Sequence, residues 1–283
     1  MSLVKISAKD VKALRDQTGA GMMDCKKALT EAEGDFDKAI EILRKKGQKL
    51  SAKRADRSAN EGVVIATTSA NRNNGVVLRL SCETDFVAKN QKFIDFAQSI
   101  VDIALKSLPN TLEDLLALPY GEGLTVAEKV TEQIGVNGEK HEITDYHKIE
   151  TAAGQGQVLP YIHMGYRAGV LVALNLEGPN FIEPGKNVAM QVAAMKPVAL
   201  DKDGVDESIV KKEIEIGMDI ARQEGKPEAM LERIAMGKLN KFFKEKTLLN
   251  QIYVKNSKQT IQTYLESLDK NLTVTDFKHV TLG

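Results

Sequence analysis

Residues 75–81 read Gly75-Val76-Val77-Leu78-Arg79-Leu80-Ser81, a run of β-branched and aliphatic side chains that favours a strand. A similar run, Val63-Val64-Ile65-Ala66-Thr67, precedes it, and Asn71 to Gly75 joins the two with an Asn-Gly pair typical of a hairpin turn. The two runs therefore predict a β-hairpin. A helix is predicted from about Lys92, and its apolar face is made by Phe93, Phe96, Ala97, Ile100 and Ile103.

The same plan recurs roughly 95 residues further on. Residues 169–175 repeat the strand pattern, and Phe181 follows them in the place that Phe86 takes in the first copy. A second helix is predicted to end at Pro197, with its inner face formed by Val188, Val192 and Met195. A last strand is expected to contain Leu272, Val274 and Val280. The repeat predicts a duplicated α+β core with antiparallel sheets, although a match this short also arises by chance.

The first 47 residues predict a small three-helix unit. Ser7, with Asp10 three residues later, forms a capping-box start, and Asp35 is placed to cap the third helix. The sequence Thr18-Gly19-Ala20-Gly21 breaks the first helix, and Gly47 is expected to end the third. So short a unit buries little surface, which favours a docking module.

Two further segments have a clear pattern. Seven of the fourteen residues from Arg44 to Arg57 are basic, but they lack interleaved aromatic residues, which favours a linker or helical extension over a phosphate-binding stripe. Between Val205 and Phe243 two apolar stripes predict a helical hairpin that turns at Gly225-Lys226-Pro227. The stripes comprise Val210, Ile214, Gly217 and Ala221 in the first helix and Leu231, Ala235, Leu239 and Phe242 in the second.

The composition of the 283 residues argues against several classes of protein. The 39 basic and 39 acidic residues cancel, so no overall charge draws the chain to nucleic acid or to a membrane. The sequence contains no apolar run of membrane-spanning length, and Met1 to Asp10 lack the apolar core of a signal peptide. Cys25 and Cys82 have no ligand or disulfide spacing, so we expect a reduced, cytoplasmic protein.

The sequence contains no recognisable catalytic motif. Gly19-Ala20-Gly21 is half of a dinucleotide-binding fingerprint and follows a predicted helix instead of a strand. The histidines His141, His147, His163 and His279 are scattered, and no motif pairs a nucleophile with a base. An enzyme is therefore disfavoured, although residues distant in sequence can still assemble a triad in space.

Two features do not suit a plain scaffold. Met22 and Met23 adjoin at the start of a helix, where both cannot easily point inward, so at least one is expected to be exposed and adaptable. Phe86 lies between a predicted strand and a helix whose N-cap is Asn90. Neither the hydrophobic pattern of the strand nor that of the helix requires Phe86 in a core. It either folds back over the helix as a staple or is presented beside an acidic residue as a wedge.

The residues around these two features carry a family resemblance. Residues 14–29, from Leu14 to Leu29, resemble the N-terminal signature of the elongation factor Ts family, and Cys82 to Lys89 resemble its second signature. Residues 161–170, which include His163, are similar to a core segment of that family, and so is the turn at 225–227. The resemblance extends in order over nearly the whole chain.

This resemblance implies a domain plan. A ubiquitin-associated-type (UBA-like) helical domain is expected at residues 1–50, with a basic linker to about 57. The two halves of the core are expected at 58–147 and 148–283, and a protruding antiparallel coiled-coil hairpin interrupts the second at about 205–245.

The resemblance also implies a function, which is guanine nucleotide exchange on the translational GTPase EF-Tu. In the family, the segment that matches Thr84, Asp85, Phe86 and Val87 dislodges Mg²⁺ beside the bound GDP. Residues that match Leu14, Met22 and Met23 grip the GTPase domain, and the second half, through the position of His163, contacts another EF-Tu domain. No cofactor, metal, direct nucleotide contact, membrane or specific nucleic acid is implied. The alternative is a translation-associated module that binds a GTPase without accelerating exchange.

The chain departs from the family pattern in three places. Arg79 and Ser81 replace an acidic residue and an asparagine, which puts the local strand contacts in doubt. Residues 108–146 follow the pattern poorly, so no role is transferred to them. Longer members of the family continue beyond the last strand into a helical tail, whereas this sequence ends at Gly283.

Overall fold

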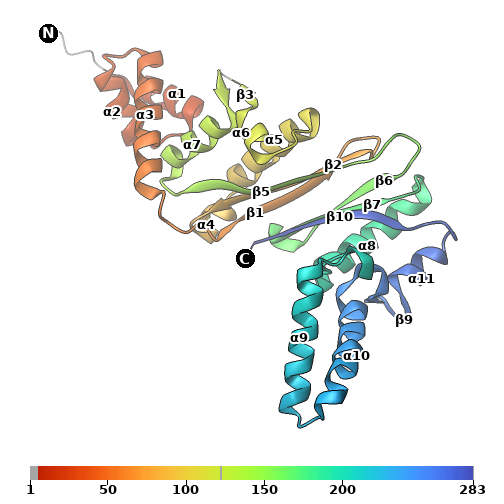
Figure 1. Cartoon of the computed structure of the whole chain (residues 1–283). Coiled ribbons are helices and arrows are strands. Elements are labelled where there is room, and N and C mark those ends of the chain that lie inside the picture. The colour runs from red at the N-terminus through yellow and green to blue at the C-terminus, as the bar shows by residue number, and fades with distance from the viewer. Residues whose placement is uncertain (1–5, 122, 283) are drawn as a thin grey trace.

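Two three-stranded antiparallel sheets form the centre of the structure, a computed structural model that describes residues 6–121 and 123–282 (Figure 1). The first sheet has the order β1-β2-β5 and the second the order β10-β7-β6. The strands are β1 (Glu61–Thr68), β2 (Asn74–Cys82), β5 (His141–Glu150), β6 (Gln157–Ile162), β7 (Ala168–Leu174) and β10 (Val274–Thr281). The predicted hairpin, the second copy and the closing strand are confirmed.

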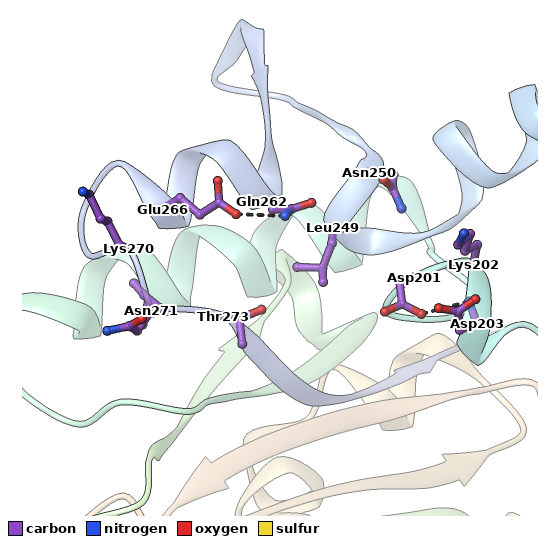
Figure 2. Close-up of a pocket in the computed structure, with 11 residues that line it drawn as sticks. Asp201, Lys202, Asp203, Leu249, Asn250, Gln262, Glu266, Lys270, Asn271 and Thr273 are labelled. Atoms are coloured by element: carbon purple, nitrogen blue, oxygen red, sulfur yellow. Dashed lines mark hydrogen bonds between the residues drawn. The ribbon is translucent and has the colours of Figure 1, made fainter.

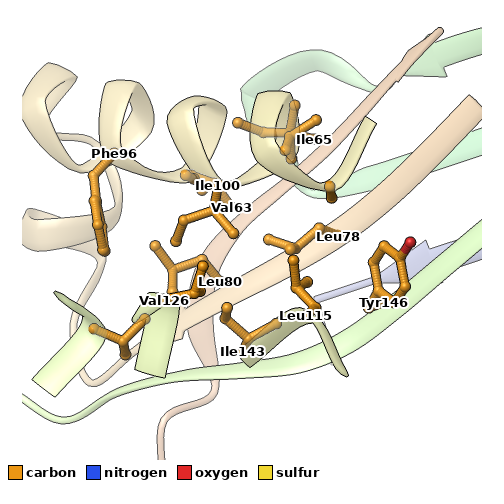
Figure 3. Packing of buried hydrophobic residues seen from close by; sticks show 14 of the residues in the cluster. Val63, Ile65, Leu78, Leu80, Phe96, Ile100, Leu115, Val126, Ile143 and Tyr146 are labelled. Carbon is orange, nitrogen blue, oxygen red and sulfur yellow. The ribbon is translucent and has the colours of Figure 1, made fainter. Parts of the chain in front are cut away.

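The two sheets share one connectivity. In each, a hairpin is followed by a helix and then by a third strand, which pairs antiparallel with the second strand of the hairpin. The helix is α5 (Gln91–Ser107) in the first half and α8 (Ile182–Met195) in the second. As predicted, α5 buries Phe93, Phe96, Ala97 and Ile100, and Ile103 is partly buried against the same cluster. Figure 3 shows Phe96 and Ile100 in this cluster with residues of β1 and β2. In α8, Val188 and Val192 are buried, but Met195 is 41% exposed because the helix ends there, just before Pro197.

The turn of the first hairpin differs from the prediction. Asn74 and Gly75 open strand β2, and the turn is made by residues 69–73, with Arg72 at φ +59°. Gly75 is required for packing between the sheets, because an added Cβ would lie 2.6 Å from Cγ1 of Val158. An Asn-Gly pair is a local turn signal, and here a contact with the other half of the chain determines the position of the glycine.

Arg79 and Ser81, the two departures from the family pattern, contact each other. The Arg79 Nε–H donates to the Ser81 hydroxyl at 2.9 Å, and an Arg79 Nη1–H donates to the carbonyl of Thr281 in β10 at 3.1 Å. Arg79 therefore joins the first sheet to the last strand of the second.

Three helices precede the first sheet: α1 (Ala8–Thr18), α2 (Met22–Glu31) and α3 (Phe36–Arg54). The capping box of Ser7 with Asp10, the break at Gly19 and the cap at Asp35 are all confirmed. The expected end of the third helix at Gly47 is wrong, because α3 continues to Arg54 and includes most of the basic stretch.

Gly47 lies where α3 crosses α7 (Val126–Asn137), a helix that was not predicted from the sequence. A Cβ on Gly47 would lie 3.3 Å from the carbonyl oxygen of Thr131, and a Cβ on Gly135 of α7 would lie 3.2 Å from the Cα of Gly47. Glycine at both positions lets the two backbones approach closely. The N-terminal helices are thereby packed onto the first half of the core.

The remaining elements surround the two sheets. The predicted helical hairpin consists of α9 (Glu207–Gln223) and α10 (Glu228–Lys246), which turn at Gly225-Lys226-Pro227 and project away from the sheets (Figure 1). At its base, Gln191 and Gln251 are fully buried and hydrogen-bonded to each other at 3.1 Å. The short elements are α4 (Asp85–Ala88), α6 (Leu112–Ala117), β3 (Pro119–Gly121), β4 (Leu124–Thr125), β8 (Ile252–Tyr253), β9 (Asn256–Thr260) and α11 (Ile261–Glu266).

Cys25 and Cys82 are buried free thiols, as expected. Within residues 6–121 and 123–282, no helix has the length and apolar character needed to cross a bilayer.

Replacing Gly135 by leucine should force α3 and α7 apart and lower the free energy of unfolding by about 1–3 kcal/mol, the usual effect of overpacking. Gly237→Ala is the matched control, because a Cβ there meets nothing within 4 Å and α10 should gain about 0.5–1 kcal/mol. Denaturant unfolding followed by circular dichroism measures both. A Gly135→Leu protein as stable as its parent would contradict the close helix crossing.

Candidate functional site

The segment that follows β2 forms a sharp corner. Thr84 caps the short helix α4 with its hydroxyl, which accepts from the backbone N–H of Val87 at 3.5 Å. Asn90 caps α5 directly afterwards. The thiol of Cys82 donates to the carbonyl of Thr84 at 3.2 Å, and burial raises the pKa of this thiol to about 12, so it does not serve as a nucleophile at neutral pH.

Phe86 points away from the protein and is 85% exposed. The staple alternative is therefore wrong, since a staple would bury the ring. Its counterpart in the second half, Phe181, packs against the core there. The residues on either side of Phe86 hold its backbone in place. Val87 packs against the hydrophobic core between α5 and the first sheet, and the Asp85 carboxylate is 2.6 Å from the Lys89 ammonium. The hydrogen bond from Lys89 and its positive charge lower the pKa of Asp85, which keeps this carboxylate ionised.

Glu139 fixes the corner from the loop between α7 and β5. Its carboxylate accepts from the Thr84 hydroxyl at 2.6 Å and from the Thr84 backbone N–H at 3.0 Å. Hydrogen bonds to an ionised acceptor are stronger than those between neutral groups. Thr84 is thus held through both its backbone and its side chain, and the residues after it start from a fixed position.

Glu83 ties the same corner to the N-terminal helices. Its carboxylate accepts from Arg54 at 2.6 Å, from Arg57 at 3.2 Å and from the backbone N–H of Lys140 at 2.7 Å. Burial opposes ionisation of Glu83, but these three hydrogen bonds outweigh it and hold its pKa below the usual value. The C-terminal end of α3 is thereby attached beside Phe86.

Both methionines at the start of α2 are exposed, Met22 by 56% and Met23 by 64%. This extends the sequence expectation, which required only one. Leu14, from the same signature, is fully buried among the three helices and has no surface of its own to offer.

A groove of about 420 Å³ separates the N-terminal helices from the corner. Gly19 lines it from the end of α1, Val87 and Phe93 line it from the corner and α5, and Val136 lines it from α7. The end of α1 and the corner after β2 therefore border one depression.

His163 lies on the second half of the core, in the loop between β6 and β7. It is exposed, and its Nδ1 is 3.1 Å from the hydroxyl of Tyr161.

The structure does not assemble the other histidines into a catalytic group. His141 is buried next to Asn137, whose side-chain oxygen is 2.7 Å from Nε2, and burial lowers its pKa to about 4 although Glu83 partly offsets the effect. His147 is exposed on β5, and burial and then Lys196 lower the pKa of His279 on β10. Among the described residues, no cluster of His, Cys, Asp or Glu is suited to hold a metal ion.

A polar hollow of about 400 Å³ lies beside α11, far along the chain from the corner (Figure 2). Some of the polar side chains that line it form hydrogen bonds with residues close in sequence. Asp201 accepts from the backbone N–H groups of Asp203 and Gly204, and Gln262 donates to Glu266 at 2.8 Å. Neither histidine nor cysteine is among the residues that line it.

The sequence marked Thr84 to Val87, Met22, Met23 and His163 as candidate contact residues, and these remain predictions. It did not indicate the contacts made by Glu83, Glu139 and Arg54. Glu83 stands inside the quoted signature, yet its partners are 26, 29 and 57 residues away. No local pattern signals such contacts. A charged residue directly after a buried strand was the one available hint.

Replacing Glu83 by glutamine should lower the free energy of unfolding by about 1–3 kcal/mol at pH 7, as expected on removing a hydrogen-bonded charge. Because the folded pKa of Glu83 is lowered, the stabilisation is fully present above the unfolded value of about 4.3 and is lost as pH falls through the folded pKa. The difference from wild type should therefore shrink below about pH 4. Thermal unfolding at several pH values tests this, with Glu232→Gln on α10 as the exposed control. A difference independent of pH would contradict the ionic role.

Comparison with known proteins agrees with the resemblance in the two signatures. A sequence profile of the family described as "Elongation factor TS" matches residues 83–283. The chain is 52% identical over 279 residues to "Elongation factor Ts" of Cytophaga hutchinsonii, covering 98% of this chain and 99% of that protein. It is 50% identical over 281 residues to the protein of that name from Christiangramia forsetii, covering 99% and 100%. This chain belongs to the elongation factor Ts family.

Proposed function

We propose that this chain binds EF-Tu–GDP and promotes the release of GDP by dislodging Mg²⁺, so that GTP can bind in its place. The observation that carries the proposal is the position of Phe86, an aromatic ring that is 85% exposed on a corner fixed by hydrogen bonds. An exposed aromatic ring on a rigid support is suited to act as an anchor in a partner protein.

The mechanism is linkage between two ligands of one GTPase. Mg²⁺ is the largest local positive charge beside the phosphates of the nucleotide, so its loss weakens the binding of GDP. A partner that fits only the form with the metal displaced must weaken nucleotide binding, and the nucleotide must weaken the partner by the same factor. No proton transfer or covalent step is needed, so the protein acts as an exchange factor and not as an enzyme in the usual sense.

Each part of the surface has a proposed role. Thr84, Asp85, Phe86 and Val87 form the wedge at the nucleotide site. Met22 and Met23 grip the GTPase domain, and the buried Leu14 supports the helices that carry them. In the second half of the core, His163 contacts a different EF-Tu domain.

The arrangement of domains is proposed accordingly. Residues 1–50 act as a UBA-like gripping domain, residues 58–147 carry the wedge, and residues 148–283 form the second half of the core. The hairpin of α9 and α10 is its coiled-coil arm. The protein is expected to act in the cytoplasm, where EF-Tu works, without a cofactor and without contacting the nucleotide, a membrane or a specific nucleic acid.

Phe86→Ala should reduce the affinity for EF-Tu by about 2–4 kcal/mol, the usual effect of truncating an anchor residue, and should slow stimulated GDP release. Its melting temperature should stay unchanged, because the ring is exposed. Release of a fluorescent GDP analogue from EF-Tu measures the effect, and Leu268→Ala, at an exposed position after α11, is the control. Unchanged release per folded molecule would mean that Phe86 is not a wedge.

Excess GDP with Mg²⁺ should dissociate the complex with EF-Tu, and chelation of Mg²⁺ should strengthen it. The coupling between the linked sites is expected to reach about 3 kcal/mol, the upper end of the common range. Calorimetric titration of EF-Tu with and without GDP gives this value directly. Equal affinity for the two forms would identify a GTPase-binding module that does not drive exchange.

A further inference from the structure

The loop between α7 and β5 contacts the corner after β2 through two consecutive residues. The Glu139 carboxylate accepts from the hydroxyl of Thr84 at 2.6 Å and from its backbone N–H at 3.0 Å. The backbone N–H of Lys140 donates to Glu83 at 2.7 Å. Residues 108–146, which include this loop, follow the family pattern poorly, and no role was transferred to them. The resemblance therefore does not account for these contacts.

The loop is itself held in place, so it can act as a support. Gly138 ends α7 in the left-handed conformation, with φ +78°, and its N–H donates to the carbonyl of Ile134 at 2.9 Å. The side-chain oxygen of Asn137 accepts from the backbone N–H of Glu139 at 3.3 Å and lies 2.7 Å from Nε2 of the buried His141. The Glu139 carboxylate therefore projects from a backbone that is tied to the helix before it and to the strand after it.

The hydrogen bond to Glu139 determines what the Thr84 hydroxyl can do. A threonine hydroxyl has a single proton and a carboxylate can only accept, so this proton points to Glu139. The lone pairs of the hydroxyl oxygen then face the backbone N–H of Val87, 3.5 Å away, and cap α4. A helix of four residues is unstable without its cap and its packing. The orientation of Phe86, which lies in this turn, therefore depends on Glu139.

We propose that Glu139 is a positioning residue for nucleotide exchange, which acts through Thr84 to hold Phe86 in the orientation that EF-Tu receives. This inference rests on the function proposed above and adds a residue from outside the two signatures. Glu139 is partly buried and Phe86 is 85% exposed, so the residue that supports and the residue that is presented are different. Without Glu139 the strands keep their pairing, but α4 frays and Phe86 samples many positions. EF-Tu must then order this turn as it binds, which lowers the affinity.

The test uses Glu139→Ala, which removes both hydrogen bonds to Thr84, and Glu139→Gln, whose single carbonyl oxygen replaces one of the two acceptors. We expect the Kd for nucleotide-free EF-Tu to rise about 10- to 30-fold in Glu139→Ala and by a smaller factor in Glu139→Gln. Glu142→Gln is the matched control, because this exposed side chain lies on the adjoining strand and pairs with Lys140 at 3.1 Å. It should bind as wild type does. Melting temperatures measured alongside show that each variant is folded in the assay.

Combining the change with Phe86→Ala shows whether Glu139 acts through the ring. In that background Glu139→Ala should change the Kd by less than about twofold, because the ring to be positioned is gone. A second measurement needs no EF-Tu. In hydrogen exchange followed by NMR, the amides of Thr84 and Val87 should exchange about tenfold faster in Glu139→Ala, whereas the amide of Val77 in the central strand β2 should keep its rate.

The outcomes separate this inference from the proposed function. If wild-type protein neither binds EF-Tu nor accelerates GDP release, the proposed function fails and this inference fails with it. If Phe86→Ala weakens binding while both Glu139 variants bind normally, or if amide exchange at Thr84 and Val87 is unchanged, only this inference is overturned. If Glu139→Ala weakens binding equally with and without Phe86, Glu139 does not act through the ring, which also overturns it.

Discussion

The carboxylate of Glu83 joins three parts of the chain that are distant in sequence. It accepts from Arg54, the last residue of α3, at 2.6 Å and from Arg57, three residues later, at 3.2 Å. It also accepts from the backbone N–H of Lys140, before β5, at 2.7 Å. The Glu83 side chain is partly buried, and the loss of its hydration is offset because these donors satisfy both carboxylate oxygens. Glu83 therefore fixes the relative positions of the end of α3, the corner after β2 and the start of β5. Because Glu139 holds the next residue, Thr84, that position extends to the segment carrying Phe86.

This fixed geometry bears on the proposed binding of EF-Tu. Ordering a flexible loop on binding reduces affinity, whereas a preorganised anchor avoids most of that cost. The corner is preorganised by Glu139, and the distance from it to Met22 and Met23 is set by Glu83 together with the close crossing of α3 and α7. Two attachment points that keep their spacing can engage one partner at the same time. A flexible linker after residue 50 would have allowed many spacings, most of them unproductive.

Elements whose signals are local were predicted correctly from the sequence. Features that depend on contacts between residues far apart in the chain were not. The β-rich runs identified the first hairpin, and the repeat of that pattern identified β7 in the second half. Capping residues located the starts of α1, α3 and α5. Gly47 and Gly75 look locally like a helix end and a turn, but each lies inside its element because another part of the chain approaches its backbone. The sequence identified Phe86 as unusual. Its exposure, and the partners that hold it, depend on contacts between residues far apart in the chain.

The two halves of the core show how such a site arises within a stable fold. They share one connectivity, and each has a phenylalanine after the central strand. Phe181 packs inward and contributes to the second core, so this loop can serve stability alone. In the first half, Val87 and Ala88 take over the packing, and Phe86 is released to the surface. The corner itself is held by the polar contacts of Glu83 and Glu139. A site built in this way can vary its exposed residue without disturbing the strands beneath, because the exposed ring and the buried anchors are different residues.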